Sequence, residues 1–347
     1  MLRYLTAGES HGRGLVAILE GLPAGIKIDE KIINAELKRR QMGFGRGQRM
    51  QIENDRALLV SGLKGNKTLG SPLAILIENK DFSIEKLHKV LCPRPGHADL
   101  SGFLKYGFTD IRECLERASA RSTAATVAIG AVCKLFLKEF KISVTSNVVS
   151  IGGAIAHDQR VNKIKQAMAN KDTLGGDFDV IAKNIPVGLG SYVQPDRRLD
   201  SRLAAGIMSI PGIKGVEIGL GFGYADKFGS QVHDAIYYSN SKGYSRSTNN
   251  AGGIEGGISN GEDIVLSACM KPISTLMKPL DSVNVLTKKS SKAATERSDI
   301  CAVESAGVVA ESVVAYVLAD ALLEKFGIDS LVDIKAAYQH YLRRIKK

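Results

Sequence analysis

A long apolar stretch near the C-terminal end, residues 303–323, limits how this chain can fold more than any other feature. It is rich in Ala and Val and is long enough to cross a lipid bilayer. It also contains Glu304, Glu311 and Asp320, and charged side chains are rare inside membrane-spanning helices. We therefore interpret the stretch as a helix that is buried inside the protein and does not span a membrane.

A second helix of similar composition is expected at residues 116–138. A Glu-Arg pair opens it, and another such pair, Glu296-Arg297, stands shortly before the helix expected at residues 302–325. This weak similarity suggests an internal duplication in which two related helices lie buried face to face.

The rest of the chain alternates short β-rich runs with amphipathic helices. Strands are expected at residues 2–7, 15–20, 57–61, 73–78, 144–151, 180–187, 215–221 and 264–270. Helices are expected at residues 30–40, 161–170 and 198–208, and an amphipathic tail helix at residues 331–347. With 347 residues, the chain can form two ordinary domains or one large domain.

The net charge indicates an acidic partner. Lys and Arg together number 47 and Asp and Glu number 36, which gives a formal charge of +11. Such an excess can serve nucleic acid, an anionic membrane or acidic small molecules. Aromatic residues make up only 6%, and no nucleic-acid-binding module is recognisable. We therefore expect neither nucleic acid nor a membrane as partner, and favour an acidic small substrate.

The five cysteines indicate a reducing environment. Their number is odd and no two form a Cys-x-x-Cys pair, which argues against a disulfide framework and against a zinc site. Residues 1–12 contain no long apolar core and hence no secretory signal. We expect a cytoplasmic protein without a bound metal.

Residues 38–50 form a basic, glycine-rich segment without an acidic residue. Arginine presents a planar fork of donors to phosphate and carboxylate groups, and glycine lets the backbone approach a ligand closely. The segment could therefore wrap a polyanion, or it could be a solvated loop whose first arginines complement a helix dipole. Its basic residues are Lys38, Arg39, Arg40, Arg46 and Arg49.

Two histidines lie in loops that would suit a proton carrier. His11 stands between two glycines after an expected strand, and His97 follows a Pro-Gly turn between Arg94 and Asp99. A carboxylate and an arginine near a histidine can tune its protonation for acid catalysis. Each histidine could instead be structural, bonded only within its own loop.

Three further segments suggest ligand contacts. Arg117, Ser119 and Arg121 lie in the first turns of the second apolar helix, where free backbone N–H groups attract anions. Residues 271–275 offer a cation and two hydroxyls directly after an expected strand. Residues 244–261 are dominated by Ser, Asn and Gly, and we interpret them as an ordered ligand loop in preference to a flexible linker.

Seven motifs, in order along essentially the whole chain, resemble those of chorismate synthases. They are GESHG at residues 8–12, GRGQRMQIEND at 45–55, RPGHAD at 94–99, ERASAR at 116–121, AGGIEGGISNG at 251–261, KPIST at 271–275, and ERSD at 296–299 followed by AGVVAESVVA. Any one of them would be weak, whereas seven in the same order are specific to the family.

The resemblance implies a fold and a reaction. The fold is α/β (α+β), a single large domain over residues 1–347 with helices between antiparallel-rich sheets in a β-α-β sandwich, assembled as a homotetramer. The reaction is the anti 1,4-elimination of phosphate from 5-enolpyruvylshikimate 3-phosphate, which gives chorismate in the shikimate pathway of aromatic amino acid biosynthesis. It needs reduced FMN without net redox change, and some members also contact NADPH.

The same resemblance implies roles for single residues. His11 matches the histidine that protonates the reduced flavin, His97 the one that assists the departing phosphate, and Asp299 the aspartate that relays the proton removed from the substrate. Substrate contacts are implied for Ser10, Arg40, Arg46, Arg49 and Arg121, and Arg40 and Arg46 also match the NADPH positions. The flavin positions are matched by Arg117, Ala118, Ser119, Gln231, Val232, Gly257, Lys271, Pro272, Ile273, Ser274, Thr275 and Arg297.

Ser298 and Ser122 depart from the family pattern, since many members have His and Glu at these two places. Neither residue is one of the implied proton carriers, although Ser298 adjoins Asp299 and bears on its orientation. The glycines of residues 38–50 would let that segment close as a lid over the flavin site. Two rival functions remain: an NAD(P)H-dependent FMN oxidoreductase, and a non-enzymatic polyanion-binding protein.

Overall fold

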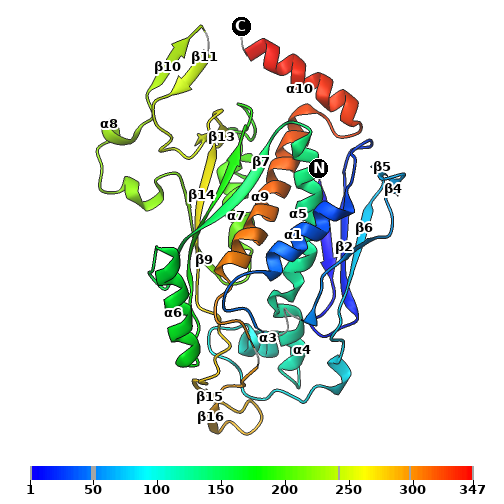
Figure 1. Ribbon diagram of the computed structural model, residues 1–347, viewed down its shortest axis with the longest axis vertical. Coiled ribbons are helices and arrows are strands. Elements are labelled where there is room, and N and C mark those ends of the chain that lie inside the picture. Colours follow the sequence, from blue (N-terminus) through cyan, green and yellow to red (C-terminus); the bar gives the residue numbers. More distant parts are fainter. Residues whose placement is uncertain (1, 48–51, 241–242, 297, 346–347) are drawn as a thin grey trace.

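Two four-stranded sheets enclose a layer of helices in the computed structural model, which describes residues 2–47, 52–240, 243–296 and 298–345 (Figure 1). The first sheet has the order β1-β2-β6-β3 and contains β1 (Arg3–Ala7), β2 (Gly14–Glu20), β3 (Ala57–Leu59) and β6 (Leu73–Glu78). The second has the order β7-β8-β14-β9 and contains β7 (Ser143–Ile151), β8 (Gly176–Lys183), β9 (Ile213–Ile218) and β14 (Ile264–Met270). All neighbouring strands in the two sheets are antiparallel.

Helices α5 (Thr123–Lys138) and α9 (Val303–Phe326) pack against each other in the middle layer. Helix α5 faces β2 and β6 of the first sheet, whereas α9 faces β7 and β8 of the second. Helix α1 (Glu30–Gln41) packs on both central helices, and α7 (Leu199–Met208) packs on α9. The predicted β-α-β sandwich with antiparallel-rich sheets is confirmed.

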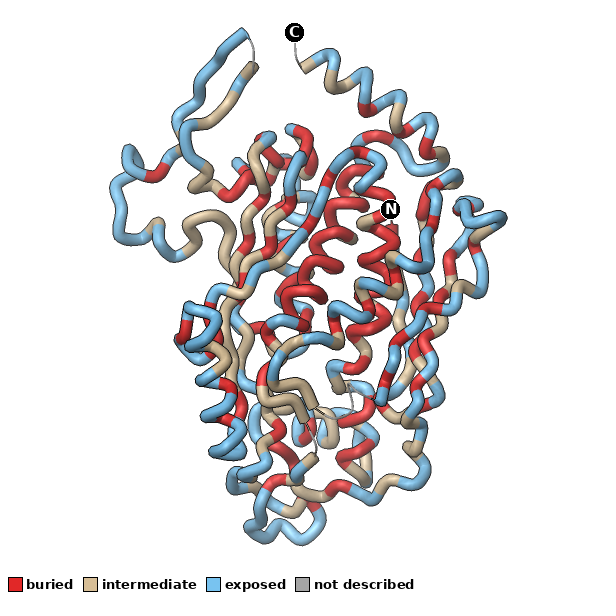
Figure 2. The backbone as a smooth tube through the Cα atoms, viewed as in Figure 1, coloured by how far each residue is buried: buried red, intermediate tan, exposed pale blue. Residues whose placement is uncertain are grey.

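Small residues let α5 and α9 approach closely. A Cβ added at Gly130 of α5 would lie 2.1 Å from the Cβ of Ser312 in α9, so no larger residue fits there without moving the helices. Both helices are buried along most of their length (Figure 2), and 89% of the most apolar segment of α9 lies inside the protein. Helix α9 is therefore a core helix, as its three acidic residues predicted.

The chain order of the main elements is repeated. The first half runs β1, β2, α1, β3, β6, α5, and the second half runs β7, β8, α7, β9, β14, α9. Helix α6 (His157–Ala169) is inserted after β7. The strand orders of the two sheets correspond position by position. This repeated topology supports the predicted internal duplication, with α5 and α9 as equivalent helices.

Smaller elements connect these parts. Hairpins pair β4 (Leu63–Lys64) with β5 (Lys67–Thr68), β10 (Ile236–Ser239) with β11 (Gly243–Arg246), β12 (Ile254–Glu255) with β13 (Ile258–Ser259), and β15 (Asp281–Val283) with β16 (Ser290–Lys292). Further helices are α3 (Asp99–Tyr106), α4 (Arg112–Ala118), α8 (Gly229–Val232) and α10 (Leu331–Ile345), with 3-10 turns at Ile84–Lys86, Ala120–Ser122, Pro195–Arg197 and Gly221–Tyr224. Helix α10 matches the predicted tail helix, and residues 244–261 are built into hairpins, so they are not a flexible linker.

The helix predicted at residues 116–138 is interrupted, so the prediction of one continuous helix was wrong. Ser119 has extended backbone angles, φ −67° and ψ 140°, and its Oγ accepts a hydrogen bond from the N–H of Arg121. A serine that bonds to the nearby backbone in this way competes with the helix. The break separates α4 from α5, and Arg117 lies in the last turn of α4 instead of the first turn of the long helix.

A buried carboxylate, Glu311 in α9, connects the helix layer to the second sheet. Its oxygens accept hydrogen bonds from Arg39 at 2.7 and 2.8 Å, from Lys134 at 2.5 Å, and from the N–H and hydroxyl of Ser146 at 2.9 and 2.6 Å. Arg39 and Lys134 also donate to Glu36. Burial opposes ionisation of Glu311, but the bonds from Arg39 and Lys134 lower its pKa. The cluster thus joins α1, α5, α9 and β7.

Candidate active site

Most of the predicted site residues gather at one end of the helix layer, where α5 and α9 begin (lower half of Figure 1). The last turn of α1 reaches the start of α5, and the Nη1 of Arg40 donates to Thr123 Oγ1 at 3.3 Å. The loop after α1 packs before the start of α9, and the N–H of Ile300 donates to the carbonyl of Gly45 at 2.8 Å. The positive ends of two helix dipoles therefore face the basic segment, which favours anions there.

Arg40 and Arg121 are buried on either side of Asp55. Arg40 Nη2 donates to one oxygen of this carboxylate at 2.8 Å, and Arg121 Nη1 donates to the other at 2.6 Å. Burial lowers the pKa of Arg40; Asp55 counters part of this effect, and the positive neighbours Arg121 and Arg46 add to it. Fixed positive groups are thus held out of water at the end of the helix layer.

Three donors of these arginines make no hydrogen bond within the part of the chain that the structure describes: Arg40 Nε, Arg46 Nε and Arg121 Nη2. The last of them lies 3.7 Å from Glu53 Oε2, in ion-pair range only. A buried N–H without an acceptor costs free energy, and an anionic ligand would supply the acceptors. Because carboxylates offset the formal charge of the arginines, these unmet donors, and not net charge, indicate a ligand site.

His11 is held between Glu116 and Asn79. Glu116 accepts hydrogen bonds from the His11 N–H at 2.7 Å and from its ring Nδ1 at 2.9 Å, and Asn79 donates to three carbonyls of the loop. The N–H of Ser10, a buried residue, donates to the carbonyl of Glu116. Asn79 Oδ1 accepts from Arg121 Nε at 2.9 Å, which connects the His11 loop to the arginines.

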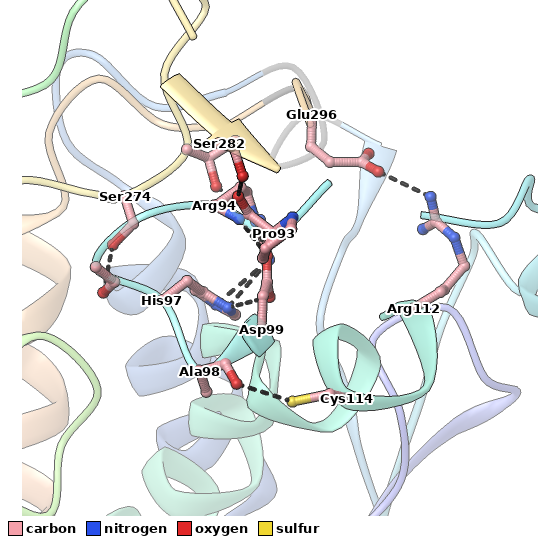
Figure 3. A network of polar contacts seen from close by, with 12 residues as sticks. Pro93, Arg94, His97, Ala98, Asp99, Arg112, Cys114, Ser274, Ser282 and Glu296 are labelled. Atoms are coloured by element: carbon pink, nitrogen blue, oxygen red, sulfur yellow. Dashed lines mark hydrogen bonds and ion pairs between the residues drawn. The ribbon is translucent and has the colours of Figure 1, made fainter. Parts of the chain in front are cut away.

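His97 belongs to a network at the start of α3 (Figure 3). Its Nδ1 lies 2.5 Å from Asp99 Oδ1, and Arg94 donates to both oxygens of Asp99 at 2.8 and 3.0 Å. Arg94 Nη2 also lies 3.2 Å from the Nδ1 of His97. Burial opposes ionisation of Asp99, but the hydrogen bonds from His97 and Arg94 lower its pKa well below the usual range. The predicted neighbours of this histidine are in place.

Acid should weaken this network. The fold holds the pKa of Asp99 below its unfolded value of about 3.9, so ionised Asp99 stabilises the fold above that value, and the stabilisation is lost as the pH falls toward the lower folded pKa. At neutral pH the wild type should therefore melt at a higher temperature than Asp99→Asn, and the difference should shrink from about pH 5 downwards. Calorimetry of both proteins over this range tests it; a difference independent of pH would contradict it.

The predicted flavin segment that begins at Lys271 packs against the loop of the second histidine. Lys271 Nζ donates to the carbonyl of Gly96 at 2.5 Å and to Ser274 Oγ at 2.6 Å. Thr275 Oγ1 accepts from Arg94 Nη1 at 2.8 Å. The structure therefore brings this segment and a predicted proton carrier together. Pro272 and Ile273 belong to the same segment.

Asp299 lies beside the described part of the basic segment. It accepts a hydrogen bond from the N–H of Gly47 at 2.6 Å and pairs with Arg46 Nη1 at 3.0 Å. Arg46 and Gly47 of the predicted lid are thus bonded to the segment just before α9. That the lid closes over the flavin site stays a prediction. Arg49 and Arg297 lie outside the described residues.

The flavin positions predicted at residues 117–119, at the end of α4 and directly after it, make contacts within the fold. Arg117 donates to the carbonyls of Thr6 and Gly8, at the end of β1. Ser119 caps the short turn that follows Ala118. These residues lie close to the His11 loop, because Glu116 in the same helix holds that loop.

Gln231, Val232 and Gly257 do not reach this end of the molecule within one chain. The first two lie in α8, on the segment that projects at the other end (Figure 1), and Gly257 lies between β12 and β13, close before β14. Lys271 follows the opposite end of β14, and seven strand residues separate the two ends by about 20 Å. One chain therefore does not assemble all the predicted flavin positions.

Sequence reasoning missed the acceptors that hold the predicted cations and histidines, namely Glu116, Asn79 and Asp55. Their partners stand 15 to 105 positions away in the chain, so spacing could not reveal the pairs. Glu116 and Asp55 do stand inside two of the seven motifs, which was a usable signal, whereas Asn79 only follows a strand.

Known proteins match the chain along nearly its whole length. The chorismate synthase family model matches residues 2–323. The chain belongs to the chorismate synthase family. The chorismate synthases of Thermoanaerobacter pseudethanolicus and Caldanaerobacter subterraneus subsp. tengcongensis are 55% and 54% identical to it over 348 residues, with 99% of each chain covered.

A solved structure described as "Crystal Structure of Chorismate Synthase" superposes with a TM-score of 0.82 at 43% identity and covers 99% of this chain and 98% of that chain. The protein is thus a lyase of the shikimate pathway. The family, fold class and enzyme class predicted from the sequence are confirmed.

Proposed function

We propose that this chorismate synthase family member converts 5-enolpyruvylshikimate 3-phosphate into chorismate and phosphate by an anti 1,4-elimination. The observation that carries the proposal is the group of Arg40, Arg46 and Arg121, whose unmet buried donors suit an anion. The substrate has a phosphate and two carboxylates, and charge-assisted hydrogen bonds are about twice as strong as neutral ones. The His11 loop adjoins this group through Asn79.

Reduced FMN is the proposed cofactor. Lys271, Ser274 and Thr275 provide a cation and two hydroxyls for its anionic groups, beside the loop of His97. When bound, reduced FMN supplies electron density to the substrate while the C–O bond breaks. Because Arg40 and Arg46 match the NADPH positions of the family, NADPH is the candidate reductant.

The chain's own residues would bind the ligands and move the protons. The arginines hold the substrate anions, and His97, bonded at Nδ1 to Asp99, delivers a proton from Nε2 to the departing phosphate. Asp299, paired with Arg46, receives the proton that the substrate ring loses, and His11 holds a proton on the flavin side. Preorganised charges are then the main contribution of the protein.

The proposed assembly is a homotetramer, and the outer face of the first sheet supports it. Apolar residues cross this face in two rows: Leu5 pairs with Ile18, and Leu76 pairs with both Val16 and Leu58. Leu5 is 74% exposed and Leu58 is 55% exposed. Apolar side chains gathered on one exposed sheet face are typical of a surface that a second copy covers.

The predicted flavin positions also need a second copy if they are to meet. Gln231, Val232 and Gly257 lie far from Lys271 within one chain. A neighbouring subunit can supply them if assembly brings its projecting segment to this site. Assembly and flavin affinity should therefore be lost together.

Leu5→Lys should reduce the assembly, because it places a charge on the apolar face at its most exposed leucine, in the edge strand β1. Light scattering during gel filtration should give a smaller mass, and flavin titration a weaker Kd. Val332→Lys is the matched control, since Val332 is 76% exposed on α10 and should leave both unchanged. An unaltered mass for Leu5→Lys would exclude this face from the assembly.

The cytoplasm is the proposed location, with neither a membrane nor nucleic acid as partner. The five cysteines all lie among the described residues and are free, as suits a reducing compartment. Among the described residues, two helical stretches are long and apolar enough to span a membrane, residues 112–138 and 303–326, and 78% and 89% of their most apolar segments are buried in the protein.

Anaerobic incubation with the substrate and photoreduced FMN tests the proposed reaction. Phosphate and the absorbance of chorismate should appear while the reduced flavin is not consumed. An FMN oxidoreductase would instead consume NAD(P)H in every turnover, and a polyanion-binding protein would show steeply salt-dependent binding without turnover. Absence of phosphate release would rule the proposal out. Repeating the assay with NADPH in place of photoreduction shows whether the protein reduces its own flavin.

A further inference from the structure

Glu116 in α4 holds the His11 loop at three points. Its carbonyl accepts from the N–H of Ser10 at 3.0 Å, its Oε2 from the N–H of His11 at 2.7 Å, and its Oε1 from the ring Nδ1 of His11 at 2.9 Å. The side chain of Glu116 is only 2% exposed. The His11 ring is therefore hydrogen-bonded to a carboxylate that is almost entirely shielded from water. This carboxylate belongs to helix α4, which fixes its position.

The ionisation of Glu116 decides where the hydrogen of His11 lies. Burial opposes the charged form, but the ring and backbone hydrogen bonds of His11 lower the pKa of Glu116. Arg112 stands behind it, with Nη1 3.5 Å from Oε1. An ionised carboxylate only accepts hydrogen bonds, so the Nδ1 that faces it must carry a hydrogen. The Nε2 of His11 is then the atom that exchanges a proton.

We propose that Glu116 is a positioning residue for His11: it keeps the hydrogen on Nδ1 and so makes Nε2 the proton-exchanging atom. This inference rests on the proposed role of His11 in the elimination. Among the described residues, the charged groups that face the ring are Glu116 from α4 and Asp81, which follows β6 and has its Oδ2 3.9 Å from Nε2. Arg112 acts on the ring only through Glu116.

The second histidine shows the same arrangement. His97 also meets a buried carboxylate through Nδ1, that of Asp99, which is 0% exposed and held by Arg94. The two sites come from different loops and different helices. Both proposed proton carriers therefore share a carboxylate that faces Nδ1 and forms an ion pair with an arginine, Arg112 at Glu116 and Arg94 at Asp99. An accidental contact at His11 is thus a poor explanation.

The hydrogen position can be measured without any turnover. Solid-state ¹⁵N spectra of the ligand-free full-length protein, labelled at histidine, separate protonated from unprotonated ring nitrogens, and His11→Asn assigns the signals. We expect neutral His11 to carry its hydrogen on Nδ1 in the wild type and to lose this preference in Glu116→Gln. His340, an exposed residue of α10, serves as the reference for a solvated ring.

The same variant should lower kcat by about 10²-fold, the lower end of the range for lost acid–base catalysis, with little change in KM. Glu113→Gln is the matched control, because Glu113 is an exposed residue of the same helix and should leave kcat and the ¹⁵N signals unchanged. A wild-type His11 with its hydrogen on Nε2, or a kcat of Glu116→Gln equal to that of the wild type, would overturn the inference. A wild type that releases no phosphate would overturn the proposed function alone, since the spectra do not depend on activity.

Discussion

Replacing His97 with alanine should slow phosphate release by about 10²- to 10⁴-fold, the range expected when a general acid is lost. The variant removes the proposed proton donor to the departing phosphate and leaves the arginine group around Asp55 in place. The loss should therefore appear in kcat much more than in KM. Rapid-mixing measurement of phosphate release with prereduced FMN under anaerobic conditions gives both constants.

His11→Ala should have an effect in the same range, because it removes the proton held on the flavin side. His157→Ala is the control for both, since His157 lies exposed on α6 and bonds only weakly to Asp158 at 3.4 Å. If both site variants released phosphate at close to the wild-type rate, the two histidines would have no place in the mechanism.

The burial of α9 could be predicted because the apolar stretch at residues 303–323 contains three acidic residues, whereas the layered arrangement was implied by the resemblance to chorismate synthases. The close packing of α5 against α9 requires small residues, as at Gly130. The break at Ser119 could not be predicted in the same way. Residues 116–121 are mostly good helix formers, so their sequence favours a continuous helix. Whether Ser119 instead caps a new turn with its side chain depends on the tertiary structure around it.

The candidate site could be predicted only in part for a related reason. Motifs marked the histidines and arginines, because these carry the chemistry, but their acceptors became visible only after folding had brought distant segments together. Asn79 is the clearest case, since it bonds at once to the His11 loop and to Arg121. Gln231 is the opposite case. It matches a flavin position in the sequence, but it lies in α8, at the end of the molecule away from the candidate active site.

Replacing Glu311 with alanine should lower the free energy of unfolding by about 3 kcal/mol, the lower end of the range for removing one partner of a buried ion pair. The variant removes one of the two carboxylates that pair with the Lys134 ammonium, whose side chain is 17% exposed, and leaves Glu36 as the other. Arg39 is 41% exposed and can turn to water or to Glu36, which is why the lower end applies. Because the chain contains no Trp, urea unfolding is best followed by circular dichroism.

Glu324→Ala provides the control within the same helix. Glu324 also pairs with two arginines, Arg197 and Arg202, but its side chain is 40% exposed. Its loss should cost less than about 1 kcal/mol, as for other surface ion pairs. Equal effects of the two variants would contradict the role given to burial. A larger effect at Glu311 would show that the charge cluster, and not apolar packing alone, fixes α1 against α9. This matters for the candidate site because α1 contains Arg40.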